Sequence, residues 1–356
     1  MAPVHLRLRA LGALTALAAA LGPAVSGCSL VGADDQPESS SDVVLVTHDS
    51  FVLPKPLIAQ FERQSGYHLV VHAAGDGGTL TNKLVLTQGN PTGDVAFGVD
   101  NTFASRALDA DVFARSDVRL PAGAQQYVVP GDDGRLAPID NGNVCVNIDT
   151  GWFTDHDVAP PRSLDDLVKP AYDGLTAVPG ATTSSTGLAF LLGTIGKYGD
   201  GWSSWWQKLV DNGATITDGW TQAYETDFTQ GGGHGHDPIV VSYDSSPAFT
   251  VPKGGDTSTT EALLDTCFRQ VEYAGVLRGT DAPDAAHRLV DFLLTPAFQS
   301  EIALNLFVYP ANDTVSLPAA FTDFAVVPDH PATLDPATIA AHRQSWIETW
   351  TDVVLR

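Results

Sequence analysis

The sequence predicts an α/β protein built from two lobes in succession. Short apolar runs rich in β-branched residues are predicted as buried strands at 43–46, 68–72 and 94–99. Helical patterns lie between them at 57–66 and 79–88, and Gly66 ends the first of these. Strands that alternate with helices at this spacing pair in parallel within one layer. This part of the chain is therefore expected to form one α/β lobe.

The same alternation resumes after Cys145 and predicts the second lobe. Ser163 begins a helix as its capping residue, and the acidic pair Asp165 and Asp166 follows in the first turn. Further strands are predicted at 175–178, 238–243 and 270–277, and further helices at 186–198, 202–210, 284–294, 296–306 and 336–355. The Gly-rich patch at 231–237 is expected to be a surface loop.

The N-terminus carries an export signal. Arg7 and Arg9 precede the apolar stretch 10–25, which has the length of a signal-peptide core and is too short to span a bilayer as a mature helix. The tetrapeptide Val25-Ser26-Gly27-Cys28 resembles a bacterial lipobox, in which the Cys is acylated. We therefore expect residues 1–27 to be a lipoprotein signal peptide and 28–41 a flexible tether on the extracytoplasmic face of the cell membrane. The alternative is an ordinary secretory signal with an incidental Cys.

Composition limits the partners. The chain has 42 acidic and 19 basic residues, a formal net charge of −23, which disfavours nucleic acid and anionic lipid surfaces. The same charge favours cationic solutes, although solubility alone also explains it. In an oxidising compartment Cys145 and Cys267 are expected to form a disulfide, with two buried free thiols as the alternative.

No catalytic signature stands out, and an enzyme is not expected. The chain lacks a Gly-x-Ser-x-Gly elbow, a phosphate-binding Gly-rich loop and a His-Glu-x-x-His motif. His234, His236 and Asp237 lie in the Gly-rich loop, where a mobile tip is expected and no metal site, with a zinc-dependent secreted protein as the rival interpretation.

Polar and aromatic residues instead gather at the predicted strand ends. In open α/β sheets, loops at the carboxyl ends of strands line the ligand crevice. Carboxylates, hydroxyls and flat rings recur there: His48 to Phe51, Gly75 to Gly78, Asp100-Asn101, Thr182 to Gly187, Asp218 to Trp220, Tyr243 to Pro247 and Asn305 to Pro310. Such a set suits a flat cationic ligand held by cation–π contact and an opposing carboxylate.

At these positions the chain resembles the thiamine-binding solute receptors of bacterial ABC importers. The resemblance lies in an ordered series of segments: 46–51, 76–77, 94–101, 183–185, 219–224, 241–243, 309–310 and 340–346. It implies a type II periplasmic-binding-protein fold, in which hinge strands join two α/β lobes around a ligand cleft. It also implies capture of thiamine or its phosphates, with an ABC permease and its ATPase as partners, no cofactor, and a monomer.

The lobe boundaries follow from this resemblance. Lobe 1 is expected at 42–139 and 268–310, lobe 2 at 140–267, and a C-terminal helical segment at 311–356.

The resemblance also implies the site residues. The family's ligand contacts fall on Asp76, Gly77, Ser184, Ser185, Trp220, Tyr243, Asp244, Ser245 and Ser246, to which the strand-end pattern adds His48, Asp100 and Phe307. Trp220 and Tyr243 are expected to face the rings of the ligand, and Asp76 to balance its charge.

The chain also departs from the family pattern. Gly180-Ala181-Thr182 stands where the family commonly has Asp-Pro-Arg, which indicates weaker recognition of phosphorylated thiamine. A receptor of the same fold for a pyrimidine precursor, iron or another solute is the nearest alternative.

Overall fold

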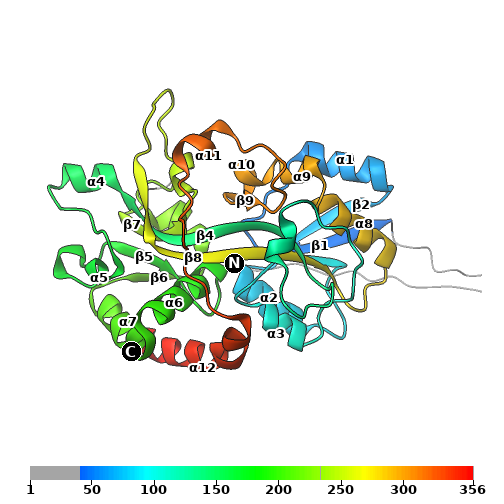
Figure 1. Ribbon diagram of the computed structural model, residues 1–356, viewed down its shortest axis with the longest axis horizontal. Coiled ribbons are helices and arrows are strands. Elements are labelled where there is room, and N and C mark those ends of the chain that lie inside the picture. Colours follow the sequence, from blue (N-terminus) through cyan, green and yellow to red (C-terminus); the bar gives the residue numbers. More distant parts are fainter. Residues whose placement is uncertain (1–40, 233, 356) are drawn as a thin grey trace, which may run out of the picture. The chain divides into compact units, whose positions relative to one another are not determined.

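The computed structural model describes residues 41–232 and 234–355, and the predicted signal peptide, Cys28 and nearly all of the tether lie outside them. One mixed sheet of nine strands runs through this part in the order β2-β1-β3-β8-β4-β7-β5-β6, with β9 paired to β4. Helices cover both faces of the sheet (Figure 1).

The first half is a parallel α/β layer, as the alternation predicts. Strand β1 (Asp42–Thr47) pairs in parallel with β2 (His68–Ala73) and β3 (Val95–Asp100). Its helices are α1 (Lys55–Ser65), α2 (Gly77–Leu86), α3 (Ala104–Asp109) and α8 (Pro283–Leu293). α1 packs with α8, and α2 packs with α3 (Figure 1).

Two long antiparallel strands join this half to the second one. β4 (Ala137–Asp149) and β8 (Thr260–Val276) pair along almost their whole length and lie side by side in Figure 1. The C-terminal end of β8 also pairs with β3, whereas the C-terminal end of β4 pairs with β7 (Ile239–Tyr243). Each long strand therefore belongs to both halves.

The two long strands differ from the sequence prediction. A strand is predicted only at 270–277, although β8 begins ten residues earlier, and no strand is predicted over β4. The strand β4 is buried at every position, yet it mixes Asp and Asn with apolar residues. It therefore shows neither the continuous apolar run nor the strict alternation that marks a strand in sequence.

The second half repeats the parallel layer. β5 (Thr176–Pro179) pairs in parallel with β6 (Thr215–Thr217) and with β7. Its helices are α4 (Thr150–Asp155), α5 (Leu164–Leu167), α6 (Ser185–Tyr198) and α7 (Trp202–Asp211), and a π-helical turn spans Gln222–Asp227. Short 3-10 turns lie at Ala124–Tyr127, Pro170–Tyr172, Gly199–Gly201 and Ser246–Phe249.

The C-terminal region returns to both halves. The helix predicted at 296–306 is instead two short helices, α9 (Pro296–Gln299) and α10 (Ile302–Leu306), because the chain turns at Ser300–Glu301. Strand β9 (Tyr309–Pro310) and helix α11 (Ala319–Phe324) follow. The last helix, α12 (Pro336–Val354), packs against α7 of the second half and α3 of the first. Among the described residues, no helix is long and apolar enough to cross a membrane.

A disulfide joins the two long strands. Cys145 in β4 and Cys267 in β8 are both buried and are bonded across 122 positions of the chain. The bond lies next to the register pair Val144 and Phe268, in the central stretch that both halves share.

We predict that removing this bond destabilises the whole fold. Closing a loop of this length restricts the unfolded chain by roughly 4–5 kcal/mol in the chain-entropy model. The double variant Cys145→Ala/Cys267→Ala should therefore unfold at a clearly lower urea concentration than the oxidised protein. Parent protein reduced with dithiothreitol is the control, and its urea midpoint of unfolding should also fall. An unchanged urea midpoint in both samples would contradict the prediction.

Candidate functional site

The two halves meet at a cavity of about 430 Å³. Asp49, Gly75, Asp76 and Thr79 line it from the first half. Thr183, Asp218, Gly219, Thr221, Gln222 and Thr226 line it from the second. The site is therefore built where strand-end loops of both halves face each other, as the topology predicts.

Asp76 connects the halves directly. It caps the N-terminus of α2, where its Oδ1 accepts a hydrogen bond from the backbone N–H of Gly77 at 2.5 Å. From the second half, the N–H of Ser185 donates to Oδ1 at 3.3 Å and the N–H of Trp220 donates to Oδ2 at 2.8 Å. One carboxylate thus holds the start of α2, the start of α6 and the Trp220 segment together. Burial raises the pKa of Asp76, and these hydrogen bonds oppose the rise.

Close backbone contact supports this junction. The Thr79 N–H donates to the Thr183 carbonyl at 3.0 Å. A Cβ on Gly77 would collide with the Ser185 Oγ, so only glycine fits at the start of α2. The segments at 76–79 and 183–185, which the sequence singled out separately, therefore form one contact surface.

Trp220 lies in an aromatic cluster beside this junction. Its ring stacks on Tyr224 with centroids 5.1 Å apart and lies 6.1 Å from Tyr243 and 5.4 Å from Phe307. The indole Nε1 donates to the Ser242 Oγ at 2.8 Å. Trp220 and Tyr243 therefore share one environment, and the backbone of Trp220 is bonded to Asp76.

Three carboxyl side chains form a row on the neighbouring strands β3, β8 and β4. Glu272 lies opposite Asp100 on one side and opposite Asp140 on the other. All three are buried: 7% of the Glu272 surface is exposed, and 0% of the surfaces of Asp100 and Asp140. We call Asp100, Glu272 and Asp140 the carboxyl row.

The carboxyl row holds protons more tightly than ordinary carboxyl groups do. Burial raises the pKa of Asp100 to about 7. Burial also raises the pKa of Asp140 and Glu272, and the charges of Asp140 and Asp100 raise that of Glu272 further.

Two neighbouring side chains face the row. The His48 Nε2 lies 3.8 Å from the Glu272 Oε2, and burial lowers the pKa of His48 to about 4, so this imidazole is neutral at pH 7. Burial raises the pKa of Tyr243, and the charges of Glu272, Asp76, Asp140 and Asp100 raise it further. The Tyr243 phenol therefore lies within electrostatic reach of all four carboxyl groups.

The structure gives the remaining predicted residues mainly local roles. The Ser184 Oγ caps α6 by accepting from the Gly187 N–H at 3.3 Å. The Ser245 Oγ donates to the Phe307 carbonyl, and the Ser246 Oγ accepts from the Tyr243 N–H at 3.2 Å. The Ser185 Oγ, in contrast, is buried and has no hydrogen-bond partner among the described residues.

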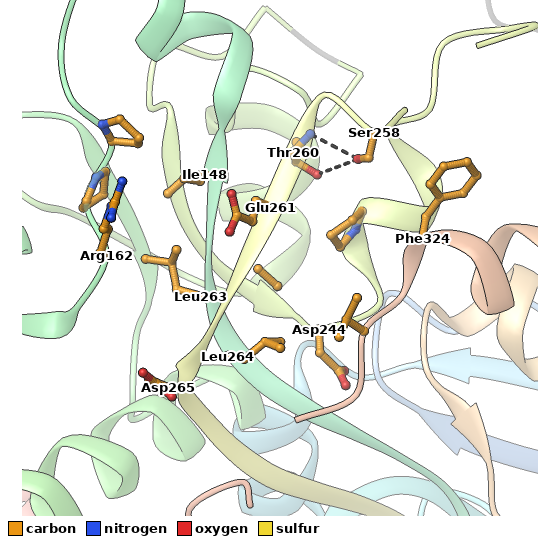
Figure 2. A pocket seen from close by; sticks show the side chains of 15 residues that line it. Ile148, Arg162, Asp244, Ser258, Thr260, Glu261, Leu263, Leu264, Asp265 and Phe324 are labelled. Carbon is orange, nitrogen blue, oxygen red and sulfur yellow. Dashed lines mark hydrogen bonds between the residues drawn. The ribbon is translucent and has the colours of Figure 1, made fainter. Parts of the chain in front are cut away.

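The structure does not bring Asp244 together with the others. Its carboxylate accepts from the Asn143 backbone N–H at 3.1 Å and from the Asn143 Nδ2 at 2.6 Å. It lines a different groove of about 570 Å³ with Thr260, Leu263 and Phe324 (Figure 2). Asp244 was grouped with the cleft residues by the family resemblance and by its strand-end position, and neither determines which side of the sheet its side chain takes.

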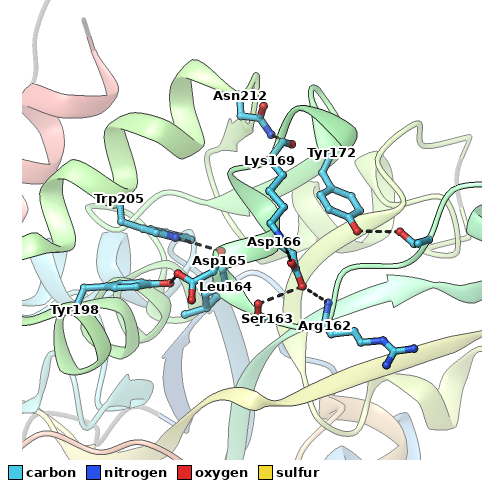
Figure 3. A network of polar contacts seen from close by, with 11 residues as sticks. Arg162, Ser163, Leu164, Asp165, Asp166, Lys169, Tyr172, Tyr198, Trp205 and Asn212 are labelled. Atoms are coloured by element: carbon cyan, nitrogen blue, oxygen red, sulfur yellow. Dashed lines mark hydrogen bonds and ion pairs between the residues drawn. The ribbon is translucent and has the colours of Figure 1, made fainter.

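A separate polar network in the second half is structural. Asp166 accepts hydrogen bonds from the Lys169 Nζ at 2.6 Å and from the Arg162 N–H at 2.8 Å, and Tyr198 donates to Asp165 at 2.8 Å (Figure 3). These bonds hold the single turn of α5. The Lys169 bond is the main cause that lowers the pKa of Asp166 to about 2.

The Gly-rich loop is separate from the site. His234 and His236 are exposed, whereas Asp237 is buried and its N–H bonds to the Asp227 carbonyl at 3.0 Å. Among the described residues, no group of three or more His, Cys, Asp or Glu is arranged to hold a metal ion.

The sequence did not single out Asp140 and Glu272. Glu272 lies between Val271 and Tyr273 inside a predicted strand, so an ionisable residue in an apolar run was an available signal, whereas Asp140 lies in a strand that no apolar pattern reveals. A carboxyl group in a buried strand is rare unless it is paired.

Comparison with known proteins places this geometry among binding proteins. Residues 56–328 match the family of bacterial extracellular solute-binding proteins. The thiamine-binding periplasmic protein of Escherichia coli is 31% identical over 324 residues, which cover 88% of this chain and 94% of that protein. The corresponding protein of Brucella suis is 29% identical over 332 residues, which cover 90% and 95%.

Solved structures agree with this comparison. A periplasmic thiamin binding protein superposes with a TM-score of 0.77 at 30% identity, covering 88% of this chain and 96% of that one. Iron-bound HitA from Pseudomonas aeruginosa superposes with a TM-score of 0.66 at 17% identity, covering 88% and 99%, and this likeness bears on the fold alone. The predicted family resemblance and the two-lobe type II fold are both confirmed.

We predict that the ligand-free protein becomes less stable as the pH rises from about 5 to about 7. The pKa of Asp100 is about 7 in the folded state and near the ordinary 3.8 when unfolded, so between these values the folded state holds a proton that the unfolded state releases. Asp140 and Glu272 act in the same direction. The free energy of unfolding should therefore fall by up to about 1 kcal/mol per pH unit for each such group.

Urea unfolding at three pH values checks this expectation. In the Asp100→Asn variant, the free energy of unfolding should depend less on pH. Asp265 is an exposed carboxyl on β8, so the Asp265→Asn variant should keep the parent's pH dependence. Stability that increases with pH across this window would contradict the prediction.

Proposed function

The chain belongs to the bacterial extracellular solute-binding proteins, and we propose that it captures thiamine and delivers it to the permease of an ABC transporter. One observation carries the proposal. The aromatic cluster around Trp220 lies beside Asp76 at the junction of the two halves, with Asp76 bonded to the Trp220 backbone. The quaternary thiazolium of thiamine is a flat cation, which suits an aromatic face beside a carboxylate.

Asp76 has two roles in this proposal. Its carboxylate lies at the cavity, where it balances the charge of the ligand. It also accepts the Ser185 and Trp220 backbone N–H groups, which belong to the opposite half. These bonds exist only when the halves are in contact, so they stabilise the closed form once the ligand is inside.

Release follows from the same geometry. In the proposed cycle the permease separates the halves, which breaks the hydrogen bonds that Asp76 and Thr79 make with the segment 183–220. Once these bonds are broken, the ligand also loses its contacts with the second half. It can then leave toward the membrane. No covalent step is needed, and the ATPase of the transporter supplies the energy.

The location of the protein is part of the proposal. Relatives named periplasmic and a family named extracellular support an extracytoplasmic position. We propose that acylation of Cys28, which lies outside the described residues, anchors a monomer to the membrane by its tether. Mass spectrometry of the mature N-terminal peptide tests the anchor: an unmodified Cys28 would refute it.

We predict that the soluble chain from residue 41 onward, kept oxidised, binds thiamine with measurable heat by titration calorimetry. Asp76→Asn should weaken this binding at least tenfold, because hydrogen bonds to a charged acceptor contribute about 1.5–3 kcal/mol. The matched control is Asp218→Asn, since Asp218 lines the same cavity but is exposed. It should change the affinity less than Asp76→Asn does.

Two outcomes would count against the proposal. No heat and no thermal shift at millimolar thiamine would refute thiamine capture. Equal losses of thiamine affinity in the Asp76→Asn and Asp218→Asn variants would refute the particular role of Asp76.

A further inference from the structure

Asp140 and Glu272 are in contact within the carboxyl row. They stand opposite each other on β4 and β8, where the Cβ atoms of directly paired residues lie about 5 Å apart. Both side chains are buried, and their carboxyl groups are within hydrogen-bonding reach of each other. Two ionised carboxylates only accept hydrogen bonds and repel each other. The contact is therefore stable only when the two groups share a proton.

The surrounding side chains do not replace this proton. Within residues 41–232 and 234–355, no group donates a hydrogen bond to either Asp140 oxygen or to the Asp100 Oδ2. The His48 Nε2 lies 3.8 Å from the Glu272 Oε2, and burial lowers the pKa of His48 to about 4. This imidazole is neutral at pH 7 and does not balance a buried negative charge. A buried carboxylate without a donor is costly, so a protonated pair is the more stable state of the ligand-free protein.

The other titratable groups near the row supply little positive charge. Tyr243 on β7 and Tyr273 on β8 are phenols, and burial raises the pKa of both, so they stay neutral. Arg343 on α12 is a cation that interacts with Asp100, at one end of the row. Arg269 on β8 lies on the opposite face of the sheet from the row. The shared proton therefore remains the main compensation for the charge at the centre of the row.

Asp76 connects the row electrostatically to the cavity between the halves. The charge of Asp76 raises the pKa of Asp100 and of Glu272. A cation beside Asp76 acts in the opposite direction, because it compensates this charge and lowers the pKa of the carboxyl groups within its reach. A cationic ligand in the cavity therefore favours loss of a proton from the row.

We propose that Asp140 and Glu272 share a proton in the ligand-free protein and release it when the cationic ligand is captured. The proposal rests on the proposed function, since it requires a cation beside Asp76. Before capture the pair carries one proton and one negative charge. On capture a carboxyl O–H bond breaks, its electrons stay on the oxygen, and the proton passes to water. The ligand brings one positive charge as the proton takes one away, so the charge of the site is conserved.

Titration calorimetry in two buffers counts the released protons on the oxidised protein. Phosphate takes up a proton with little heat and Tris with much heat, so the binding heat of thiamine should differ between them. We expect about 0.3 to 1 proton released per thiamine near neutral pH, and an affinity that rises by up to about tenfold per pH unit between about pH 6 and 8. Thiamine keeps its charge over this range. Equal heats in both buffers, or proton uptake, would overturn the proposal.

Two isosteric variants locate the proton. Glu272→Gln and Asp140→Asn each remove one member of the pair, so each should at least halve the number of protons released per thiamine. The affinity of each variant should also depend less on pH than that of the parent. Asp265 is an exposed carboxyl on β8, so Asp265→Asn is the matched control and should release as many protons as the parent. Unchanged proton release in both isosteric variants would overturn the assignment to this pair.

Infrared spectroscopy of the parent protein separates the possible failures. The C=O stretch of a protonated carboxyl should be present at neutral pH without ligand and should weaken when thiamine is added. A purely structural role of the pair would leave this band unchanged. Where a variant does not fold, the calorimetry and the infrared band of the parent decide alone. Failure of the parent to bind thiamine refutes the proposed function, whereas thiamine binding with an unchanged band refutes only the release of the proton.

Discussion

The antiparallel pairing of β4 with β8 is the constraint on which the rest of the structure depends. These strands run through both halves, and a disulfide between Cys145 and Cys267 fixes their relation in the middle. The same pairing sets Glu272 between Asp100 and Asp140. Burial raises the pKa of all three carboxyl groups, so the strands that join the halves also keep protons on this row.

Hydrogen bonds join the loops of the two halves at the cavity. Asp76 receives backbone N–H groups from two segments of the opposite half, and Thr79 donates to Thr183. Such bonds are strong when made and are lost completely when the halves separate, which suits a clamp that has to open again. The aromatic cluster of Trp220, Tyr224, Tyr243 and Phe307 lies on one side of this contact and the carboxyl row is within reach of Tyr243. Flat faces and negative charge are therefore supplied by different elements that meet only in the folded chain.

The sequence predicts the parallel layers, and the structure brings some of the predicted site residues together at the cavity between the halves. The elements β1 to β3 and α6 to α7 follow from apolar runs and helical periodicity, and the segments around Asp76, Ser185 and Trp220 follow from their strand-end positions. The sequence does not predict β4, because Asp140, Asn141 and Asn143 interrupt its apolar pattern. It also does not single out Asp140 on this strand or Glu272 on β8. Their importance depends on cross-strand register, which no local pattern contains. The hydrogen bond from Asn143 to the Asp244 carboxylate likewise depends on cross-strand register.

A crystal structure of the protein with thiamine tests the central claim most directly. We predict that the positively charged ring of thiamine lies at the cavity between the halves, within about 6 Å of the Trp220 ring and beside the Asp76 carboxylate. Asp76 should remain bonded to the backbone N–H groups of Ser185 and Trp220. A complex in which this ring lies away from both Trp220 and Asp76 would contradict the proposed function.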